Sequence, residues 1–276
     1  MQMRKQKIGF GRLRYIFISH AHGDHFFGLI GLLSTMSVLK AKQSVDIFAP
    51  QLVIDVMLYQ MEQLGYSLQM KINWHVLKED YTGILLDKKN YIVEAFPLQH
   101  SVPVHGFIFR EKVTQKNIDS EAIEKYQLSI PEIIAAKDGK NIIRDNAETI
   151  PNENVTLPLH NPLKYAYCTD TTPVENHPMV DNAHLLYHEA TFAEKDRTLS
   201  EKTFHSTAAD AAHSALKNNV QHLLIGHFSG RYRKLDLLED EARKIFPNTT
   251  LGKEGMRIRI DSKENTIQIL PANTSA

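Results

Sequence analysis

Apolar and polar residues alternate along this chain in patterns typical of strands and helices in turn. The apolar, β-branched run at residues 16–19 predicts a buried strand, and leucines, isoleucine and methionine at helical spacing predict a helix over residues 29–39. The same reasoning predicts strands at 45–48, 72–76, 91–96, 106–109, 165–168, 185–187 and 223–226, and helices at 52–64, 208–216 and 235–245. Residues 256–260 and 266–269 flank a polar turn, as in a hairpin. This alternation predicts an α/β fold.

The pattern changes between residues 112 and 157. Polar and charged residues dominate there, apolar periodicity fades, and Pro131, Gly139 and Pro151 interrupt the stretch. We expect an inserted arm over residues 112–157 that projects from a single domain spanning residues 1–276.

Composition restricts the choice of partners and compartment. The 276 residues contain 32 Lys and Arg against 32 Asp and Glu, so binding to a nucleic acid would depend on a local patch or on metal ions. The one cysteine, Cys168, allows no intrachain disulfide and fits a reducing cytosol. No run is long enough for a transmembrane helix and no secretory signal opens the chain, so we expect a cytoplasmic enzyme without a membrane partner.

Polar chemistry is concentrated directly after the first predicted strand, at residues 20–25. Three histidines and an aspartate occupy these six positions: His20, His22, Asp24 and His25. Imidazole and carboxylate groups are costly to bury without partners, so a strand that ends in them favours metal binding. His20 and His22 are expected on one side of the turn, with Asp24 and His25 facing a second ion, as in a two-metal hydrolytic centre. The alternative is a solvated histidine-rich turn.

Three more donors follow predicted strands further along the chain. His100 comes after the strand at 91–96, Asp170 after 165–168, and His227 after 223–226. Each alone would be read as an ordinary polar residue at the end of a strand. Together with residues 20–25 they place the same donor chemistry at four strand ends, and a carboxylate at Asp170 could bridge two ions.

Two further residues are candidates for catalysis. Glu189 follows an apolar strand, and His205 precedes a predicted helix start. A carboxylate that accepts a hydrogen bond from an imidazole raises the imidazole pKa and holds its orientation, which suits a general acid. The alternative for His205 is a neighbour of the helix N-cap without a chemical role.

These residues together resemble the metallo-β-lactamase superfamily. Within that superfamily, four segments resemble the ribonuclease Z family, whose enzymes remove the 3′ trailer from precursor tRNA: residues 26–33 (FFGLIGLL), 188–192 (HEATF), 205–207 (HST) and 227–232 (HFSGRY). The resemblance covers nearly the whole chain and is weakest in the arm.

The resemblance implies a four-layer α/β/β/α sandwich, a homodimer and two Zn²⁺ per subunit, although Mn²⁺ or another divalent ion is an alternative. His20, His22 and His100 would hold one ion, Asp24, His25 and His227 the other, and Asp170 would bridge them. Asp24 would also orient or deprotonate the attacking water. His205, supported by Glu189, would protonate the leaving 3′ oxygen, so that the tRNA keeps a 3′-hydroxyl.

The arm of the family grips the tRNA body, and here it carries six basic against eight acidic residues. Candidates for a local basic patch are Lys112, Lys116, Lys137, Lys140 and Arg144, and Arg231 in the last motif is a further substrate-binding candidate. The family normally begins with a segment that supplies the first strands. This chain starts at a position that corresponds to the end of that segment, so we expect a sandwich without the first strands and with an exposed sheet edge.

Two alternatives to a tRNA endonuclease stay open. One is a hydrolase of a small substrate from the same superfamily, such as a lactonase or a cyclic-nucleotide phosphodiesterase, for which a long polar arm is unnecessary. The other is an inactive, truncated RNA-binding remnant, against which the complete set of seven donors argues.

Overall fold

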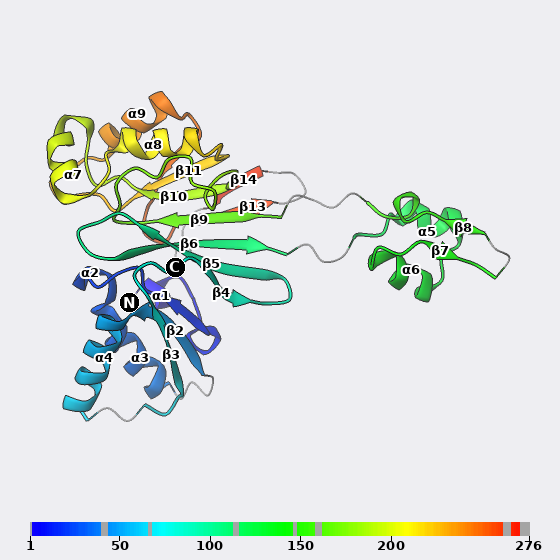
Figure 1. Ribbon diagram of the computed structural model, residues 1–276, viewed down its shortest axis with the longest axis horizontal. Helices are drawn as coiled ribbons and strands as arrows, with labels where there is room; N and C mark the ends of the chain where they lie inside the picture. Colours follow the sequence, from blue (N-terminus) through cyan, green and yellow to red (C-terminus); the bar gives the residue numbers. More distant parts are fainter. Residues whose placement is uncertain are drawn as a thin grey trace.

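Two β-sheets stacked face to face form the centre of the structure (Figure 1). The computed structural model describes residues 2–39, 44–65, 68–112, 116–145, 148–157, 162–261 and 266–270. Buried aromatic and aliphatic side chains fill the space between the sheets, with Phe48 and Leu77 from one and Val93 and Phe107 from the other. The ring of Phe17 lies 5.5 Å from that of Phe107, so the two sheets share one apolar interface.

The first sheet is parallel and carries its helices on the outer face (Figure 1). Its strands, in spatial order, are β1 (Tyr15–Phe17), β2 (Val45–Pro50) and β3 (Ile72–Leu77). The helices are α2 (Gly23–Phe26), α3 (Gly28–Val38) and α4 (Gln51–Gln63). Leu33 and Met36 of α3 and Val53 and Met57 of α4 pack against the strands, which buries the apolar faces that the sequence pattern predicts.

The second sheet is mixed and has the spatial order β12-β11-β10-β9-β6-β5-β4 within the described residues. Its strands are β4 (Gly83–Asp87), β5 (Tyr91–Leu98), β6 (Val104–Glu111), β9 (Lys164–Cys168), β10 (Leu185–Glu189), β11 (His222–Gly226) and β12 (Thr249–Leu251). The strands β9 to β12 are parallel, so the segments that follow them meet at one edge of the sheet.

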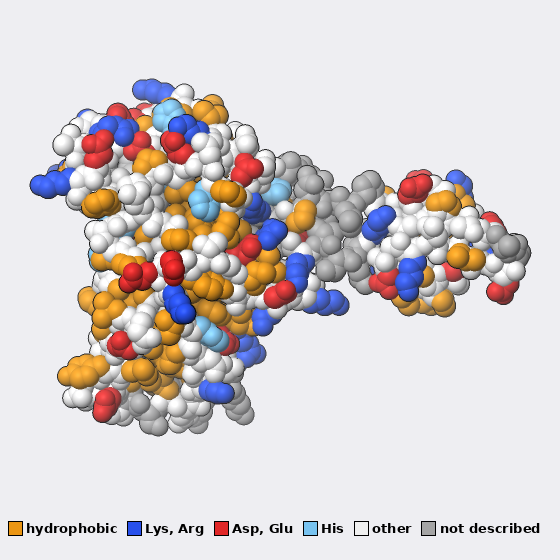
Figure 2. All heavy atoms as spheres, viewed as in Figure 1, with side chains coloured by type: hydrophobic (Ala, Val, Ile, Leu, Met, Phe, Trp, Pro, Cys, Tyr) orange, Lys and Arg blue, Asp and Glu red, His pale blue; other side chains and the backbone are white. Residues whose placement is uncertain are grey.

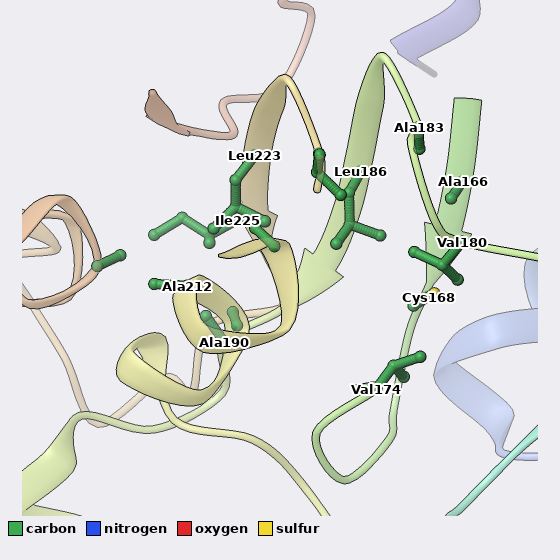
Figure 3. Close-up of a cluster of buried hydrophobic side chains, with 14 of the residues drawn as sticks. Ala166, Cys168, Val174, Val180, Ala183, Leu186, Ala190, Ala212, Leu223 and Ile225 are labelled. Atoms are coloured by element: carbon green, nitrogen blue, oxygen red, sulfur yellow. The ribbon is translucent and has the colours of Figure 1, made fainter. Parts of the chain in front are cut away.

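Helices α7 (Arg197–Thr203), α8 (Ala208–Lys217) and α9 (Asp236–Ile245) cover the outer face of the second sheet (Figure 1). The alanine-rich face of α8 lies on β10 and β11, where Ala212 is close to Leu223 and Ile225 (Figure 3). Cys168 belongs to the same cluster, and burial raises the pKa of its thiol, which agrees with a packing role. With helices outside both sheets, the predicted α/β/β/α sandwich is confirmed.

A small helical unit projects from the sandwich between β6 and β9 (Figure 1). It contains α5 (Ser120–Tyr126), α6 (Ile130–Lys137) and the short strands β7 (Ile142–Ile143) and β8 (Thr149–Ile150). The sequence predicts little apolar packing here, but the unit has a buried core of its own: Ala122, Leu128, Ala136, Ile142, Ile150 and Val155. We call residues 116–157 the arm.

The remaining elements lie at the two ends of the described chain and in loops. A short helix, α1 (Gln2–Lys5), opens it, and strands β13 (Arg257–Asp261) and β14 (Thr266–Leu270) form the predicted antiparallel hairpin. Short 3₁₀ turns occur at Phe10–Arg12, Asn152–Asn154 and Glu194–Asp196. None of the helices within the described residues is both long and apolar enough to cross a membrane. The expected absence of strands ahead of β1 stays a prediction.

Candidate metal centre

The histidine cluster begins three residues after β1, where the chain turns into α2. The backbone N–H of His105, at the start of β6, donates to the carbonyl of Ser19, which fixes the cluster beside the second sheet. His20 is fully buried, and its Nδ1 lies 3.0 Å from the hydroxyl of Ser19. Its Nε2 is buried without a hydrogen-bond partner. Burial lowers the pKa of His20 to about 3, so the ring is neutral.

His22 and His100 complete one group of donors around the unpartnered nitrogen of His20. His100 Nδ1 donates to the carbonyl of Phe204 at 2.9 Å, and because burial lowers the pKa of His100, its Nε2 is left as a lone pair. That Nε2 is 3.4 Å from His22 Nδ1. Ligand atoms of His20, His22, His100 and Asp170 all lie within 4.8 Å of one another.

Asp24, His25 and His227 form a second group with the same spacing of ligand atoms. His25 Nε2 lies 3.4 Å from a carboxylate oxygen of Asp24, and His227 Nε2 lies 4.0 Å from the same oxygen. The Asp24 side chain is 70% exposed, so this side of the cluster is open to an incoming molecule.

The two oxygens of Asp170 face different groups. Its Oδ2 is 3.6 Å from His20 Nε2 and 4.0 Å from His100 Nε2. Its Oδ1 is 3.4 Å from both His25 Nε2 and His227 Nε2. Burial raises the pKa of Asp170, but the hydrogen bond to His25 and the charge of His227 outweigh it and hold that pKa below its ordinary range. A carboxylate in this position can bridge two cations.

The donors fit divalent metal ions. Imidazole nitrogens and carboxylate oxygens are the ligands that zinc takes in catalytic sites, and a buried imidazole nitrogen without a partner needs a cation or a proton donor. The structure brings all seven predicted ligands together, whereas their binding of metal stays a prediction.

Glu189 and His205 lie beside the second group, as the sequence predicts. Glu189 is fully buried, and its Oε1 accepts a hydrogen bond from His205 Nδ1 at 2.7 Å. Burial lowers the pKa of His205, but this hydrogen bond and the charge of Glu189 outweigh the effect and raise it. Ligand atoms of His205, Asp170 and His227 lie within 4.8 Å of one another, so His205 can reach a group bound at the cluster.

The six predicted substrate-binding residues lie outside this cluster. Arg231 is nearby, with its guanidinium 5.0 Å above the ring of Phe192, which in turn packs on His205. Lys112 follows β6 and pairs with Asp87. The arm leaves the sheet between the end of β6 and the start of β9, which is the edge opposite His100 and Asp170.

Within the arm the basic side chains have different surroundings. Lys116 Nζ lies 2.7 Å from Asn152 Oδ1, and Arg144 forms ion pairs with Glu132 and Glu148. These two cations thus hold the arm together. Lys137 and Lys140 are exposed.

Sequence reasoning missed three groups that orient the donors: the hydroxyls of Ser19 and Thr191 and the carbonyl of Phe204. Thr191 and Phe204 belong to or adjoin the quoted motifs, but nothing in the sequence shows which atom a threonine or a carbonyl contacts. Phe204 adopts a left-handed backbone with φ 56°, which turns its carbonyl toward His100.

Comparisons with known proteins identify the family. A sequence profile described as the Metallo-beta-lactamase superfamily matches residues 3–114. The chain is 39% identical over 261 residues to "Ribonuclease Z" of Parabacteroides distasonis, covering 94% of this chain and 86% of that protein. It is 38% identical over 261 residues to "Ribonuclease Z" of Bacteroides fragilis, with the same coverage. The chain belongs to the ribonuclease Z family.

A solved ribonuclease Z structure has the same fold. The short form of human tRNase Z superposes with a TM-score of 0.61 at 24% identity, covering 91% of this chain and 81% of that one. The predicted ribonuclease Z family, its metallo-β-lactamase fold and its class of enzyme, an endoribonuclease hydrolase, are therefore confirmed.

Proposed function

We propose that the chain removes the 3′ trailer from precursor tRNA by hydrolysing one phosphodiester bond with the help of two divalent ions. The observation that carries the proposal is the central position of Asp170, whose two oxygens face two separate groups of histidines. Membership of the ribonuclease Z family supports the substrate, because both relatives described above are named for this activity.

The proposed ligands are divided by the geometry around Asp170. His20, His22 and His100 would hold one ion, and Asp24, His25 and His227 the other, with Asp170 between them. Zinc suits this donor set, and manganese is the alternative. A pair of such ions supplies an activated water at neutral pH and neutralises charge on a phosphate.

The residues of the chain supply the proton transfers. Asp24 is exposed and adjoins both His25 and His227, so its carboxylate can accept a proton from the attacking water. The water oxygen forms a bond to phosphorus and the bond from phosphorus to the 3′ oxygen breaks. His205 donates its proton to that oxygen, and Glu189 holds the resulting neutral ring in place. The tRNA keeps a 3′-hydroxyl and the trailer keeps the phosphate.

The arm is proposed to bind the body of the tRNA. It projects from the sandwich at the sheet edge opposite the metal centre, and a tRNA is long enough to contact both (Figure 1). Acidic and basic side chains are mixed on its surface (Figure 2). Exposed Lys137 and Lys140 are therefore better candidates for phosphate contacts than Arg144, which is held by Glu132.

A homodimer is proposed from the apolar surface of the first helical layer. Figure 2 shows hydrophobic side chains at the surface over this part of the molecule. The exposed residues in and next to α3 and α4 are Phe27, Val38, Leu39, Leu52, Leu58, Tyr59 and Leu64. Apolar side chains gathered on one face are typical of a protein interface.

Cleavage of a precursor tRNA tests the proposal. The purified chain, supplied with zinc, is expected to cut the precursor at the end of the acceptor stem and to leave a 3′-hydroxyl, and Asp170→Asn is expected to abolish cutting. Exposed Asp181 offers a matched Asp181→Asn control that should cut normally. Intact precursor after incubation with protein that carries zinc would contradict the proposal.

A further inference from the structure

The hydroxyl of Thr191 lies between a carboxylate and a proposed metal ligand. Thr191 comes two residues after β10 and is buried. Its Oγ1 is 2.6 Å from Glu189 Oε2 and 2.8 Å from His227 Nδ1. The proton transfers described above do not use this hydroxyl.

The direction of these hydrogen bonds follows from counting protons. A hydroxyl has one proton, and Thr191 has two acceptors for it, the carboxylate of Glu189 at 2.6 Å and the carbonyl of His227 at 2.9 Å. Both acceptors lack a proton to give back. Whichever of them the hydroxyl donates to, Oγ1 has only lone pairs left for His227, so Nδ1 of that ring must be the donor.

We infer that Thr191 is a positioning residue that fixes the tautomer of His227. A neutral imidazole with its proton on Nδ1 has a lone pair on Nε2, and this Nε2 faces Asp170 Oδ1 at 3.4 Å. The inference rests on the proposed metal centre, because a lone pair aimed at this point is useful when an ion binds there. A hydrogen bond to the outer nitrogen of a histidine ligand sets its tautomer and strengthens the ligand.

Glu189 thereby anchors two histidines through different oxygens. Its Oε1 accepts from His205 and from the backbone N–H of Thr171, and its Oε2 accepts from the hydroxyl and the backbone N–H of Thr191. Removal of the Thr191 hydroxyl leaves a backbone donor on Oε2 and does not touch Oε1. Such a change acts on His227 and spares the contact with His205.

Two substitutions separate the hydroxyl from the bulk of the side chain. Thr191→Val keeps the shape and removes the hydroxyl, whereas Thr191→Ser keeps the hydroxyl. Nitrogen NMR of the metal-free proteins at pH 8 reports the tautomer of His227. We expect the Nδ1–H form in the wild type and in Thr191→Ser, and the Nε2–H form or a mixture in Thr191→Val. Competition with a zinc chelator should show one ion bound about 10- to 100-fold more weakly in Thr191→Val alone.

The results separate this inference from the proposed function. The same His227 tautomer in the wild type and Thr191→Val, or zinc affinities that are equal in all three proteins, would overturn the role of Thr191. A wild type that binds no zinc would overturn the metal centre instead, and the tautomer comparison in the metal-free proteins would still decide the role of Thr191.

Discussion

At the scale of single residues, the site depends on backbone positions that few residues adopt. Asp170 and His227 both have left-handed backbones, with φ of 45° and 56°, directly after their strands. Such conformations are unfavourable for residues other than glycine and persist where the surrounding structure holds them. Here the strained turns bring both side chains back over the sheet edge, where His227 Nε2 meets Asp170 Oδ1.

Loss of the proposed general acid should slow cleavage without removing metal. We expect His205→Ala to lower kcat for precursor tRNA by about 10²- to 10⁴-fold, because the leaving oxygen then departs without a proton donor. Zinc content should match the wild type. His213, exposed on α8, provides a His213→Ala control with normal turnover. Normal turnover in His205→Ala would exclude His205 from the reaction.

The charge of Glu189 should be visible in the titration of its partner. In the metal-free protein the pKa of His205 lies above its ordinary value, because Glu189 outweighs the effect of burial. Glu189→Gln removes the charge, so burial should prevail and the pKa should fall. Proton NMR titration measures this, with His222 as a control because burial and Arg243 cause its shift. An unchanged His205 pKa would mean that Glu189 does not tune it.

Donor residues were predictable because each follows an apolar strand, and parallel strands end at a common edge. The groups that orient the donors were not predictable. The contact of Ser19 with His20 and the contact of Phe204 with His100 depend on loop conformation, which hydrophobic periodicity does not encode.

At the scale of elements, the arm shows where a sequence pattern is too short to interpret. Helix α5 has seven residues and α6 has eight, so each gives only two turns of apolar spacing. Their apolar side chains pack on one another and not on the sandwich, as Leu128 and Ala136 do. The three-residue strand β12 and the polar helix α7 escaped prediction for the same reason.

Charge on the arm should govern affinity for tRNA and leave the chemistry unchanged. Lys137→Glu combined with Lys140→Glu should raise KM for precursor tRNA and reduce the slope of log affinity against log salt by about 2, since two phosphate contacts would be lost. Hydrolysis of a small phosphodiester should not change. The same charge change at exposed Lys89 and Lys244 is the control. Equal KM values in both double variants would argue against tRNA binding by the arm.

At the scale of the whole molecule, the chain has no net charge, so attraction for RNA must be local. The sandwich was predictable as a fold because its long strands and helices repeat a clear apolar pattern. Its assembly was predictable only as a resemblance, since an interface needs a surface and not a periodicity. The exposed apolar side chains of α3 and α4 now supply that surface.

Disruption of this surface should yield monomers. We expect the wild type to form a dimer, and Val38→Glu combined with Leu58→Glu to shift it to a monomer, because burial of two carboxylates in an apolar interface is costly. Light scattering after size-exclusion chromatography measures the mass. Ile134→Glu, at an exposed apolar position in the arm, should stay dimeric. A wild-type monomer would refute the proposed interface.

Titration of the metal-free protein with zinc, followed by precursor tRNA cleavage at each point, tests the central claim most directly. Cleavage should be absent from the metal-free protein and should rise to a plateau at about two ions per chain, as a bridged pair requires. Full cleavage in the metal-free protein, or a plateau with a single ion bound, would contradict a two-ion centre around Asp170.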